Sequence, residues 1–315
     1  MNNSRIDIDK YSFSLAPLRG ITGKEFRTAL TRNFNGISAC FLPFVSVTEV
    51  SADKFSRYSN IFTLDELLNK VDYEVIPQII GNYPPAIARI SAMFRDNGFN
   101  HVNLNLGCPM PQITKKMRGS GLLPYPDKIK SILDEVFKVN NLKFSVKIRL
   151  GLNSYEDAYD VIAVLNNYPL HELIIHPRLA IDRYAGEINL TEFEKVMKMT
   201  SIPVTYNGDI VDYDTFIDKT LRFPNITNYM IGRGLVACPF LVEAFKANHS
   251  LDYNFYFDKF RNFYYDLIDS LEECEERDNV SRLKAYWIYF KKFFPDSEEV
   301  YHKMVRCNSI SEMKI

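Results

Sequence analysis

The sequence predicts an α/β protein, a (β/α)8 TIM barrel followed by a small all-α C-terminal domain. Short apolar β-like runs alternate with helical stretches, which is the pattern that gives parallel sheets. Eight such strand–helix units fit in roughly 235 residues, as a (β/α)8 barrel requires. From about His249 onward the β pattern disappears. We therefore expect a barrel over residues 1–248 and a helical domain over residues 249–315. A doubly wound sheet is the competing architecture, but no Gly-x-Gly-x-x-Gly turn follows the first run.

The first half of the barrel is expected to contain four strands with helices between them. Thr22 stands where a helix N-cap is expected, with Glu25 as the reciprocal residue of a capping box. Pro84 begins a helix that runs to about Asn97, and a further helix is expected from about Asp127. The four strands are expected at residues 13–17, 39–46, 74–81 and 101–106.

The second half repeats this pattern. Its first strand carries Lys147 and Arg149 on one face of an otherwise apolar run. A helix is expected from about Pro239, after the last strand. In the C-terminal region, residues 252–276 and 281–294 have helical spacing. The four strands are expected at residues 144–150, 172–176, 202–208 and 229–234.

The composition is that of an ordinary globular protein, with 46% hydrophobic and 24% charged residues. A net charge of −1 argues against a dedicated nucleic-acid binder but allows a local basic patch. The five cysteines are widely spread without zinc-ligand spacing, so we expect reduced thiols and no metal site. The first ten residues have no apolar signal core, and no run approaches about 18 apolar residues. We therefore expect a cytoplasmic protein.

A thiol follows the fourth predicted strand. The alternating run ends in Gly107-Cys108-Pro109, a turn that can continue neither a strand nor a helix. In α/β folds, chemistry is usually placed at the carboxyl ends of the strands. An arbitrary cysteine is more often a small buried apolar residue. The flanking glycine and proline, together with Asn105 two residues before the turn, favour a functional role for Cys108.

Polar side chains fall at the predicted carboxyl ends of several strands. In a barrel interior such groups are costly to bury unless they converge on a ligand or on each other. Taken alone, His176 would be interpreted as a core histidine and Lys147 as a residue that faces solvent. As a group the residues predict a site. They are Gln78, Asn105, Cys108, Lys147, His176, Asn207 and Arg233.

The last two predicted strands end in Asn207-Gly208-Asp209 and Gly232-Arg233-Gly234. In many barrels the loops at this position bind phosphate, because glycines let backbone N–H groups approach an oxyanion. Arg233 can add a charge. Each loop alone could be a structural turn, but together they predict a phosphorylated ligand, such as flavin mononucleotide (FMN) or a phosphosugar. The segment Gly119-Ser120-Gly121 lacks the ending of a P-loop and is interpreted as a flexible turn.

Basic and aromatic residues alternate in the second helical stretch of the C-terminal region. In such a pattern the basic residues can bind a nucleic-acid backbone and the aromatic residues can stack on bases. The alternative is an amphipathic helix whose aromatic residues pack inward. We favour this alternative for the aromatic residues and leave both interpretations open for the cations. The acidic cluster at residues 272–276 is interpreted as a solvated face. The cations are Arg282, Lys284, Lys291 and Lys292.

With these motifs the chain resembles the tRNA-dihydrouridine synthases, flavin-dependent enzymes that reduce specific uridines in tRNA. The match runs in order through residues 15–247. Residues 15–22, with Phe26 and Arg27 after them, resemble the opening flavin loop of the family. Residues 103–109 and 119–123 are similar to the family signature. The remaining matches are Gln78 and residues 146–149, 175–178, 184–186, 207–209 and 231–234.

The resemblance implies that the chain binds FMN and that NADPH, or alternatively NADH, reduces it. Lys147 would lie near the N1–C2 side of the flavin and stabilise negative charge on the reduced ring. Gln78 and His176 would hold the ring by hydrogen bonds. The implied FMN-binding residues are Pro17, Leu18, Arg19, Gln78, Lys147, His176, Asn207, Gly208, Asp209, Gly232 and Arg233.

The resemblance also implies a mechanism, in which uracil C6 receives a hydride from the flavin and C5 receives a proton from Cys108. An unperturbed thiol has a pKa of about 8.5 and is mostly protonated at neutral pH. Asn105 and Arg178 would bind the uracil, which has to leave its stack to reach a barrel mouth.

The helical C-terminal region resembles the family's tRNA-binding domain. There Arg282, Lys284, Lys291 and Lys292 would contact tRNA. The resemblance is strongest to the shorter bacterial type, which acts in the D-loop near position 16. We expect the chain to work as a monomer.

Two positions depart from the family pattern. Arg19 stands where the family often has an acid, and Asn103 replaces the usual Asp of the signature. The first would alter flavin or RNA contacts, and the second would alter strand-end packing. Two other functions remain open. An FMN-dependent reductase of a free pyrimidine or a small enone would need no RNA-binding tail. A tRNA-binding protein without redox activity would have no use for Cys108 and Lys147.

Overall fold

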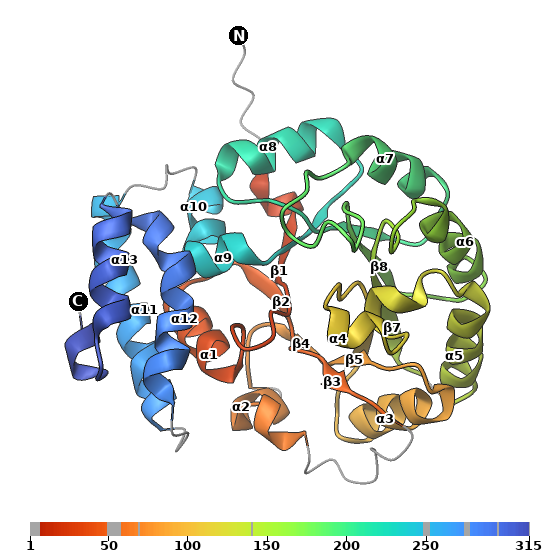
Figure 1. The fold of residues 1–315 in the computed structure, drawn as a ribbon, viewed down its shortest axis with the longest axis horizontal. Helices are drawn as coiled ribbons and strands as arrows, with labels where there is room; N and C mark the ends of the chain where they lie inside the picture. Colours follow the sequence, from red (N-terminus) through yellow and green to blue (C-terminus); the bar gives the residue numbers. More distant parts are fainter. Residues whose placement is uncertain are drawn as a thin grey trace. The chain divides into compact units, whose positions relative to one another are not determined.

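The computed structural model describes residues 7–48, 58–68, 70–139, 141–247, 253–273, 278–294 and 296–314. Strands and helices alternate along the chain, which confirms the predicted α/β class (Figure 1). The strands form one sheet in the order β3-β5-β6-β7-β8-β9-β10-β1-β2-β4. From β5 to β10 every neighbouring pair is parallel, as strand–helix–strand connections require.

The strands correspond to the eight predicted runs, with the second and the third run each in two pieces. Pro77 has no N–H for the sheet ladder, so the third run is divided between Ile76 and Gln78. On one edge Leu42 N donates to Ile76 O, and on the other Asn103 N donates to Pro77 O, both at 2.9 Å. The two pieces therefore act together as one barrel strand. The strands are β1 Ser12–Leu15, β2 Ile37–Phe41, β3 Val45–Ser46, β4 Glu74–Ile76, β5 Gln78–Ile80, β6 His101–Leu106, β7 Lys143–Arg149, β8 Glu172–His176, β9 Val204–Tyr206 and β10 Asn228–Ile231.

The barrel helices begin close to the predicted positions. Helix α3, Pro84–Asp96, starts at the predicted proline, and α5, Pro126–Val139, starts one residue before Asp127. A short helix that begins at Arg233 precedes the one expected from Pro239. The other barrel helices are α1 Lys24–Asn33, α2 Leu64–Leu67, α4 Pro111–Thr114, α6 Glu156–Leu165, α7 Leu190–Lys198, α8 Tyr213–Arg222, α9 Arg233–Ala237 and α10 Leu241–Ala247.

Helix α1 does not begin with the predicted capping box. Its N-cap is Gly23, and no side chain caps it. The hydroxyl of Thr22 instead accepts a hydrogen bond from Leu18 N at 2.8 Å and closes the loop after β1. Glu25 pairs with Arg282, whose Nη2 lies 2.9 Å from its Oε1. The capping prediction was wrong because Thr22 has a closer backbone partner in the preceding loop.

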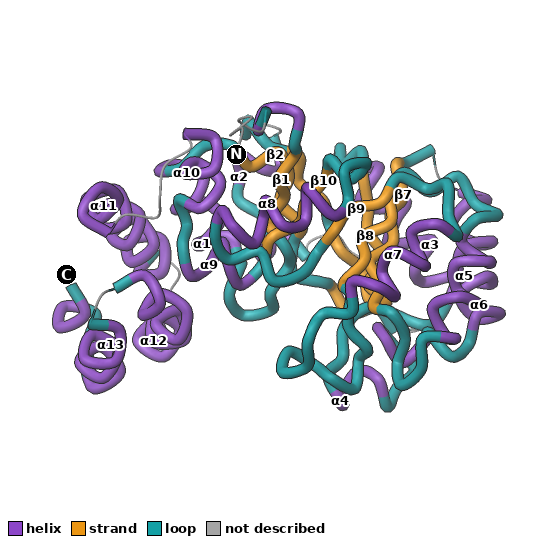
Figure 2. Tube along the Cα trace, turned by 90° about the horizontal axis from the view of Figure 1, so that it is seen from above, coloured by secondary structure: helices purple, strands orange, loops and turns teal. Residues whose placement is uncertain are grey.

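By its internal contacts the chain divides into two compact units. Unit 2 comprises residues 41–208 and 228–230, and unit 1 comprises the remainder. Within unit 2, helices α3, α5, α6 and α7 lie outside strands β6–β9, while α4 lies beyond the strand ends (Figures 1 and 2). The predicted domain boundary between residues 248 and 249 lies outside the described residues, so it stays a prediction.

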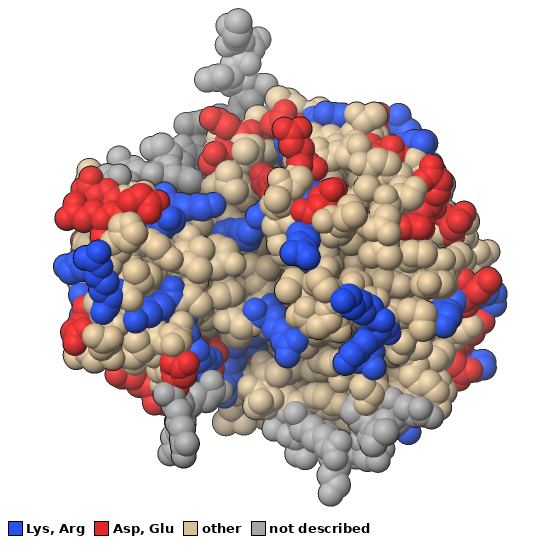
Figure 3. Space-filling model, viewed as in Figure 1, with Lys and Arg blue, Asp and Glu red and all other residues tan. Residues whose placement is uncertain are grey.

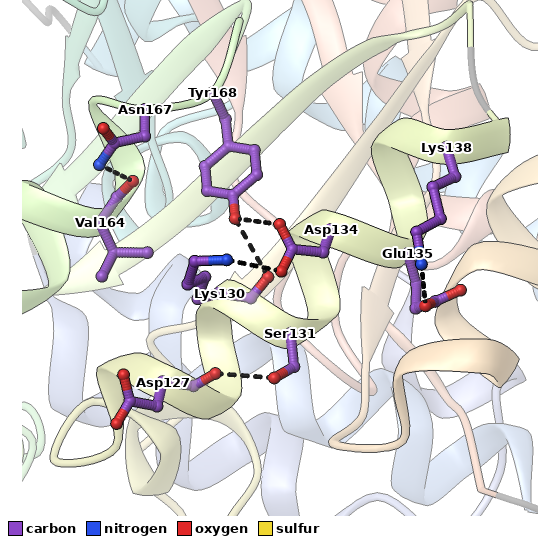
Figure 4. A network of polar contacts seen from close by, with 9 residues as sticks. All are labelled: Asp127, Lys130, Ser131, Asp134, Glu135, Lys138, Val164, Asn167 and Tyr168. Carbon is purple, nitrogen blue, oxygen red and sulfur yellow. Dashed lines mark hydrogen bonds and ion pairs between the residues drawn. The ribbon is translucent and has the colours of Figure 1, made fainter.

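A polar network on the outer side of unit 2 ties the loop before β8 to α5 (Figure 4). The Tyr168 hydroxyl donates to Asp134 Oδ1 at 2.7 Å, and Lys130 Nζ lies 2.8 Å from Asp134 Oδ2. These hydrogen bonds, that of Lys130 first, lower the pKa of Asp134. Burial and the neighbouring carboxylate raise the pKa of Tyr168 to about 12. Both effects keep the tyrosine protonated and the aspartate charged, which preserves the contact at neutral pH.

The C-terminal helices of unit 1 enclose an aromatic cluster. Helix α11, Tyr253–Glu272, packs against α1 and α12. The ring of Trp287 is fully buried and its Nε1 donates to Tyr264 Oη at 3.0 Å. Tyr286 stacks on Phe26 and donates to the Ile21 carbonyl at 2.7 Å. This inward packing confirms the amphipathic interpretation of the aromatic residues. The last α-helix, α13, was not predicted from the sequence. The C-terminal α-helices are α11, α12 Asn279–Phe290 and α13 Ser297–Arg306.

The described cysteines are free thiols. Cys40, Cys238 and Cys307 are buried, whereas Cys108 is partly exposed. Burial raises the pKa of the Cys238 thiol. Cys274 lies outside the described residues. In the described part of the chain, no cluster of His, Cys, Asp and Glu has a metal-binding arrangement, and no helix is long and apolar enough to cross a membrane.

We predict that Trp287→Ala lowers the free energy of unfolding by about 3–5 kcal/mol. The change removes a fully buried ring and leaves the Tyr264 hydroxyl without one of its hydrogen bonds. Urea denaturation followed by circular dichroism measures the loss. The control is Ile288→Ala, because the neighbouring Ile288 side chain is 53% exposed and its loss should change stability by less than about 0.5 kcal/mol. Equal losses in both variants would show that the aromatic cluster does not stabilise the protein.

Candidate functional site

Cys108 lies on a turn that is held from both sides. Its backbone N–H and that of Gly107 donate to Asn105 Oδ1 at 2.9 and 3.0 Å, which bends the chain directly after β6. On the other side Ser120 donates to the Cys108 carbonyl twice, from its backbone N at 3.2 Å and from its hydroxyl at 2.9 Å. The thiol is therefore carried by a rigid turn.

The segment interpreted as a flexible turn is part of this support. Gly119 and Gly121 lie in a short buried 3-10 helix, Gly119–Leu122, so the prediction of flexibility was wrong. Gly119 has φ of +55°, and a Cβ there would lie 2.9 Å from the Cys108 carbonyl oxygen. A Cβ on Gly121 would lie 2.4 Å from the Thr114 carbonyl oxygen. Only glycine lets the two segments pack this closely.

Strand β7 brings two cations to the Cys108 turn. The register pairs Asn105 with Lys147, and Arg149 follows on the same face two residues later. Arg149 Nε donates to the Gly107 carbonyl at 3.1 Å, and its Nη1 donates to the Leu179 carbonyl at 3.0 Å. Arg149 thus ties the loop after β6 to the loop after β8.

Lys147 is the more unusual of the two cations. Its pKa is lowered to about 7, chiefly by burial and also by the charge of Arg149, while Cys108 acts in the opposite direction. These effects require that Cys108, Lys147 and Arg149 are close neighbours. Among the described residues Lys147 forms no ion pair or hydrogen bond. By solvent exposure the Lys147 side chain is partly buried. A partly buried amine without such a contact is suited to bind an anionic or electron-rich group.

His176 and Arg178 lie together on the next strand end. Arg178 Nη1 lies 3.0 Å from His176 Nε2, and its Nε donates to the Gly186 carbonyl. The Tyr184 ring lies 6.4 Å from the His176 ring and 5.2 Å from the Arg149 guanidinium. Arg178 is buried and holds the loop that carries Tyr184.

A row of buried amides completes the site in unit 2. Asn105 Nδ2 donates to Gln78 Oε1, and Gln78 Nε2 donates to Asn103 Oδ1, both at 2.7 Å. The structure thus brings a set of predicted site residues into one unit. They are Gln78, Asn105, Cys108, Lys147, His176 and Arg178.

The residues of the two predicted phosphate loops are divided between the units. Asn207 and Gly208 belong to unit 2, whereas Asp209, Gly232 and Arg233 belong to unit 1. Asn207 Nδ2 donates to the Met230 carbonyl at 2.8 Å and so fixes the end of β9. In unit 1, Arg233 Nη2 lies 2.7 Å from Asp209 Oδ1, and both side chains are partly exposed.

The loop after β1 carries Pro17, Leu18 and Arg19. The Leu18 carbonyl accepts from Ile21 N and Thr22 N, at 3.0 and 2.9 Å, which closes the loop. Arg19 is exposed. The predicted cofactor contacts of these three residues and of both phosphate loops stay predictions.

The four predicted tRNA-binding cations differ in their surroundings. Arg282 pairs with the buried carboxylate of Glu25. Lys291 pairs with Glu298 at 2.7 Å, which lowers the pKa of that carboxyl. Within the described residues, Lys284 and Lys292 form no ion pair. These two lysines are therefore the more available for a phosphate backbone.

For three residues that support the site, the sequence did not predict this role. Arg149 was noted only for its place on the strand, although a second cation two residues after Lys147 is a signal for a shared inward face. Asn103 has the same period-two relation to Asn105. Ser120 gave no signal, because its partner Cys108 is twelve positions away in the sequence.

Comparison with known proteins shows the family of the chain. The sequence profile of the family described as "Dihydrouridine synthase (Dus)" matches residues 14–311. "tRNA-dihydrouridine synthase B" of Pasteurella multocida is 29% identical over 238 residues, which cover 74% of this chain and 68% of the relative. "tRNA-dihydrouridine(16) synthase" of Haemophilus influenzae is 25% identical over 329 residues, which cover 96% of this chain and 97% of the relative.

Solved structures of similar fold include reductases. A complex of 2-naphthoyl-CoA reductase matches with a TM-score of 0.58 at 11% identity, covering 76% of this chain and 50% of that chain. Morphinone reductase matches with a TM-score of 0.52 at 10% identity, covering 76% of this chain and 86% of that chain. At these identities the likeness concerns the fold alone. It confirms the predicted TIM-barrel class.

We predict that, in the cofactor-free protein, the wild type becomes more stable relative to Lys147→Met as the pH rises from about 7 to 9. The folded-state pKa of Lys147 is about 7, against 10.5 for an ordinary lysine. Between these values the unfolded state binds more protons, so the free energy of unfolding rises with pH, by up to about 1.4 kcal/mol per pH unit.

Urea denaturation at four pH values from 6 to 9 provides the measurement. Lys198→Met serves as the control, because the side chain of Lys198 is 70% exposed and its removal should add no such slope. A difference between the wild type and Lys147→Met that stays constant over this pH range would contradict the lowered pKa.

Proposed function

Because the chain belongs to the dihydrouridine synthase family, we propose that it is a flavin-dependent oxidoreductase that reduces the C5–C6 double bond of a uridine in tRNA. The observation that carries the proposal is the rigid turn of Cys108 beside the partly buried amine of Lys147. A proton donor and a cation at the end of a barrel strand are the groups that this reduction requires of the protein.

The residues of unit 2 fit the ring of FMN. Lys147 offers a partly buried amine, which suits the N1–C2 side of a flavin because the reduced ring carries negative charge there. Gln78 uses one N–H and one lone pair internally and keeps one of each for a ligand. His176 is the last residue of β8, the strand that pairs with β7 of Lys147. Bound by these residues, FMN would supply the hydride that reduces the base.

We assign the FMN phosphate to the loops that contain Asn207, Gly208, Asp209, Gly232 and Arg233. The partly exposed guanidinium of Arg233 supports this assignment, since arginine binds phosphate in a bidentate manner. Asp209 Oδ1 now occupies one side of that guanidinium, so a phosphate would bind to its other N–H groups or replace the carboxylate. Pro17, Leu18 and Arg19 complete the proposed cofactor contacts.

Cys108 is the proposed general acid. Reduction of uracil adds one hydride to C6 and one proton to C5, and the thiol supplies the proton. The hydrogen bonds with Asn105 and Ser120 hold the backbone that carries the thiol, which favours proton transfer to one carbon atom. Asn105 uses one of its two amide N–H groups for Gln78, and Arg178 uses its Nε and one Nη1 N–H for Gly186 and His176. We assign the uracil carbonyls to these two side chains.

We predict that Cys108→Ala still binds the yellow flavin and is still reduced by NADPH. Transfer to tRNA in a single turnover should become about 10²- to 10⁴-fold slower, because the proton donor is lost. Stopped-flow absorbance of the flavin separates the two half-reactions. Cys307→Ala removes a buried thiol of unit 1 and is expected to keep both rates. A normal rate of tRNA reduction in Cys108→Ala would refute the assignment.

The proposed partners are tRNA as substrate and NADPH as reductant, with the protein acting as a monomer. The name of the H. influenzae relative supports uridine 16 of the D-loop as the target. On the face drawn in Figure 3, lysine and arginine side chains gather in separate patches rather than one continuous stripe. Such patches can contact a phosphate backbone although the net charge is only −1. Dihydrouridine mapping in tRNA from cells that lack the protein tests the target.

We predict that the double variant Lys284→Ala/Lys292→Ala weakens tRNA binding and reduces its salt dependence. Each lost phosphate contact should lower the slope of log K against log salt by about 1. Fluorescence titrations at several salt concentrations measure this slope. Arg282→Ala should have a smaller effect, since Glu25 already neutralises that cation. The control is Lys138→Ala/Lys198→Ala on α5 and α7. If it changed the slope as much as the test variant, the C-terminal helices would not be the RNA-binding region.

A further inference from the structure

A line of hydrogen bonds leads from the Cys108 turn into the core of unit 2. The Cys108 N–H donates to Asn105 Oδ1 at 2.9 Å. Asn105 Nδ2 donates to Gln78 Oε1, and Gln78 Nε2 donates to Asn103 Oδ1, both at 2.7 Å. The three amide side chains are buried, so these bonds are formed without competition from bulk water.

The line continues to a histidine at the first residue of β6. Asn103 Nδ2 donates to Ser145 Oγ at 2.8 Å, and Ser145 Oγ lies 2.7 Å from His101 Nε2. His101 Nδ1 faces Glu74 Oε1 at 3.6 Å, a distance typical of an electrostatic contact rather than a strong hydrogen bond. The line therefore spans β6 from its last residues to its first.

The backbone determines the direction of every hydrogen bond in this line. A peptide N–H can only donate, so Asn105 must present its oxygen to the Cys108 turn and its nitrogen to Gln78. An amide has one accepting and one donating end. Gln78 must then present its oxygen to Asn105 and its nitrogen to Asn103. For the same reason Asn103 donates to Ser145.

The donor-to-acceptor direction of these hydrogen bonds continues through Ser145 to the ring of His101. The Ser145 hydroxyl accepts from Asn103 and has one proton of its own. Among the described residues its other hydrogen-bond partner is His101 Nε2. A buried hydroxyl proton without an acceptor is costly, so this proton is donated to Nε2. The ring proton of His101 is then on Nδ1, facing Glu74.

Charged and titratable groups surround His101 from neighbouring elements. Glu74 on β4 has a lowered pKa, chiefly through its contact with His101, and Lys143 Nζ on β7 lies 3.9 Å from the same carboxylate. The ring of His171, before β8, lies 5.1 Å from the ring of His101. Burial lowers the pKa of His171 and raises that of Glu172 on β8. The Nδ1–H of His101 is therefore directed at the carboxylate most strongly held in its charged form.

We propose that Asn103 is a positioning residue. Its amide completes the line that orients Gln78 and Asn105 beneath the Cys108 turn, and it places the ring proton of His101 on Nδ1. The proposal rests on the proposed function only where it names Cys108 as the acid whose position matters. The hydrogen-bond line itself does not depend on that function.

The chemistry of residue 103 makes the proposal testable. An aspartate at 103 would still accept from Gln78, so the Cys108 turn would keep its support. Its second oxygen would accept from Ser145, and the serine would then have to accept from His101 Nε2–H. Asn103→Asp should therefore move the ring proton from Nδ1 to Nε2. Asn103→Leu should instead remove the acceptor of Gln78 and loosen the turn.

Nitrogen-15 NMR of histidine-labelled protein measures the first effect. In the wild type we expect His101 to show the pattern of the Nδ1–H tautomer, assigned by loss of its signals in His101→Gln. In Asn103→Asp we expect the Nε2–H pattern. A wild-type His101 protonated at Nε2 would overturn the proposal even if Asn103→Asp does not fold. An unchanged tautomer in a folded Asn103→Asp would overturn it as well.

Hydrogen exchange of the Gly107 and Cys108 amides measures the second effect. We expect Asn103→Leu to exchange these amides at least about tenfold faster, and Asn103→Asp to leave their exchange unchanged. Ser91→Ala is the matched control, because Ser91 is equally buried but donates only within α3. Faster exchange in the control, or unchanged exchange in Asn103→Leu, would contradict the positioning role.

Activity assays keep the two proposals apart. If Asn103 acts as proposed, tRNA-dependent flavin oxidation should be slower in Asn103→Leu, whereas Ser91→Ala should retain the wild-type rate. A wild type that never forms dihydrouridine but shows the expected tautomers would refute the proposed function and leave the hydrogen-bond line intact. An active wild type with the opposite tautomer would refute the role of Asn103 alone.

Discussion

The structure of the candidate site depends on one constraint, which is that an amide buried between parallel strands must form hydrogen bonds at both ends. The side chains of Gln78, Asn103 and Asn105 are buried, so an unpaired end would cost more than a hydrogen bond normally contributes. Each amide is therefore locked by the next, and the first is locked by the peptide N–H of Cys108. The same hydrogen bonds hold the turn of Cys108 and fix the orientation of the three buried amides.

The same interior also concentrates positive charge. Lys147 and Arg149 share one face of β7 close to Cys108, and burial is the largest cause that lowers the pKa of each. Arg149 offsets part of its burial by donating to two carbonyl groups, whereas Lys147 has no such contacts among the described residues. The site is thus incomplete without a ligand that accepts hydrogen bonds or carries negative charge, which a flavin ring does.

In unit 1 the packing of aromatic rings limits what the basic residues can do. Trp287 and Tyr286 are used in the core, and Arg282 is held by Glu25. A pattern that alternates cations with rings is typical of RNA-binding surfaces, yet here most of the rings stabilise the helices. Only cations that remain outside this packing, such as Lys292, can contribute to binding without a cost in stability.

The sequence by itself determined the order of strands and helices, the proline start of α3 and the place of Cys108 after β6, because these follow from local periodicity and from residues that end a strand. It also predicted that most of the site residues of unit 2 lie together, since polar side chains are uncommon at the ends of buried strands. Only the tertiary structure decided that Thr22 closes a loop instead of capping a helix, and that Asn103 and Arg149 support the Cys108 turn. These roles depend on register and on partners distant in sequence, which a period-two pattern does not encode.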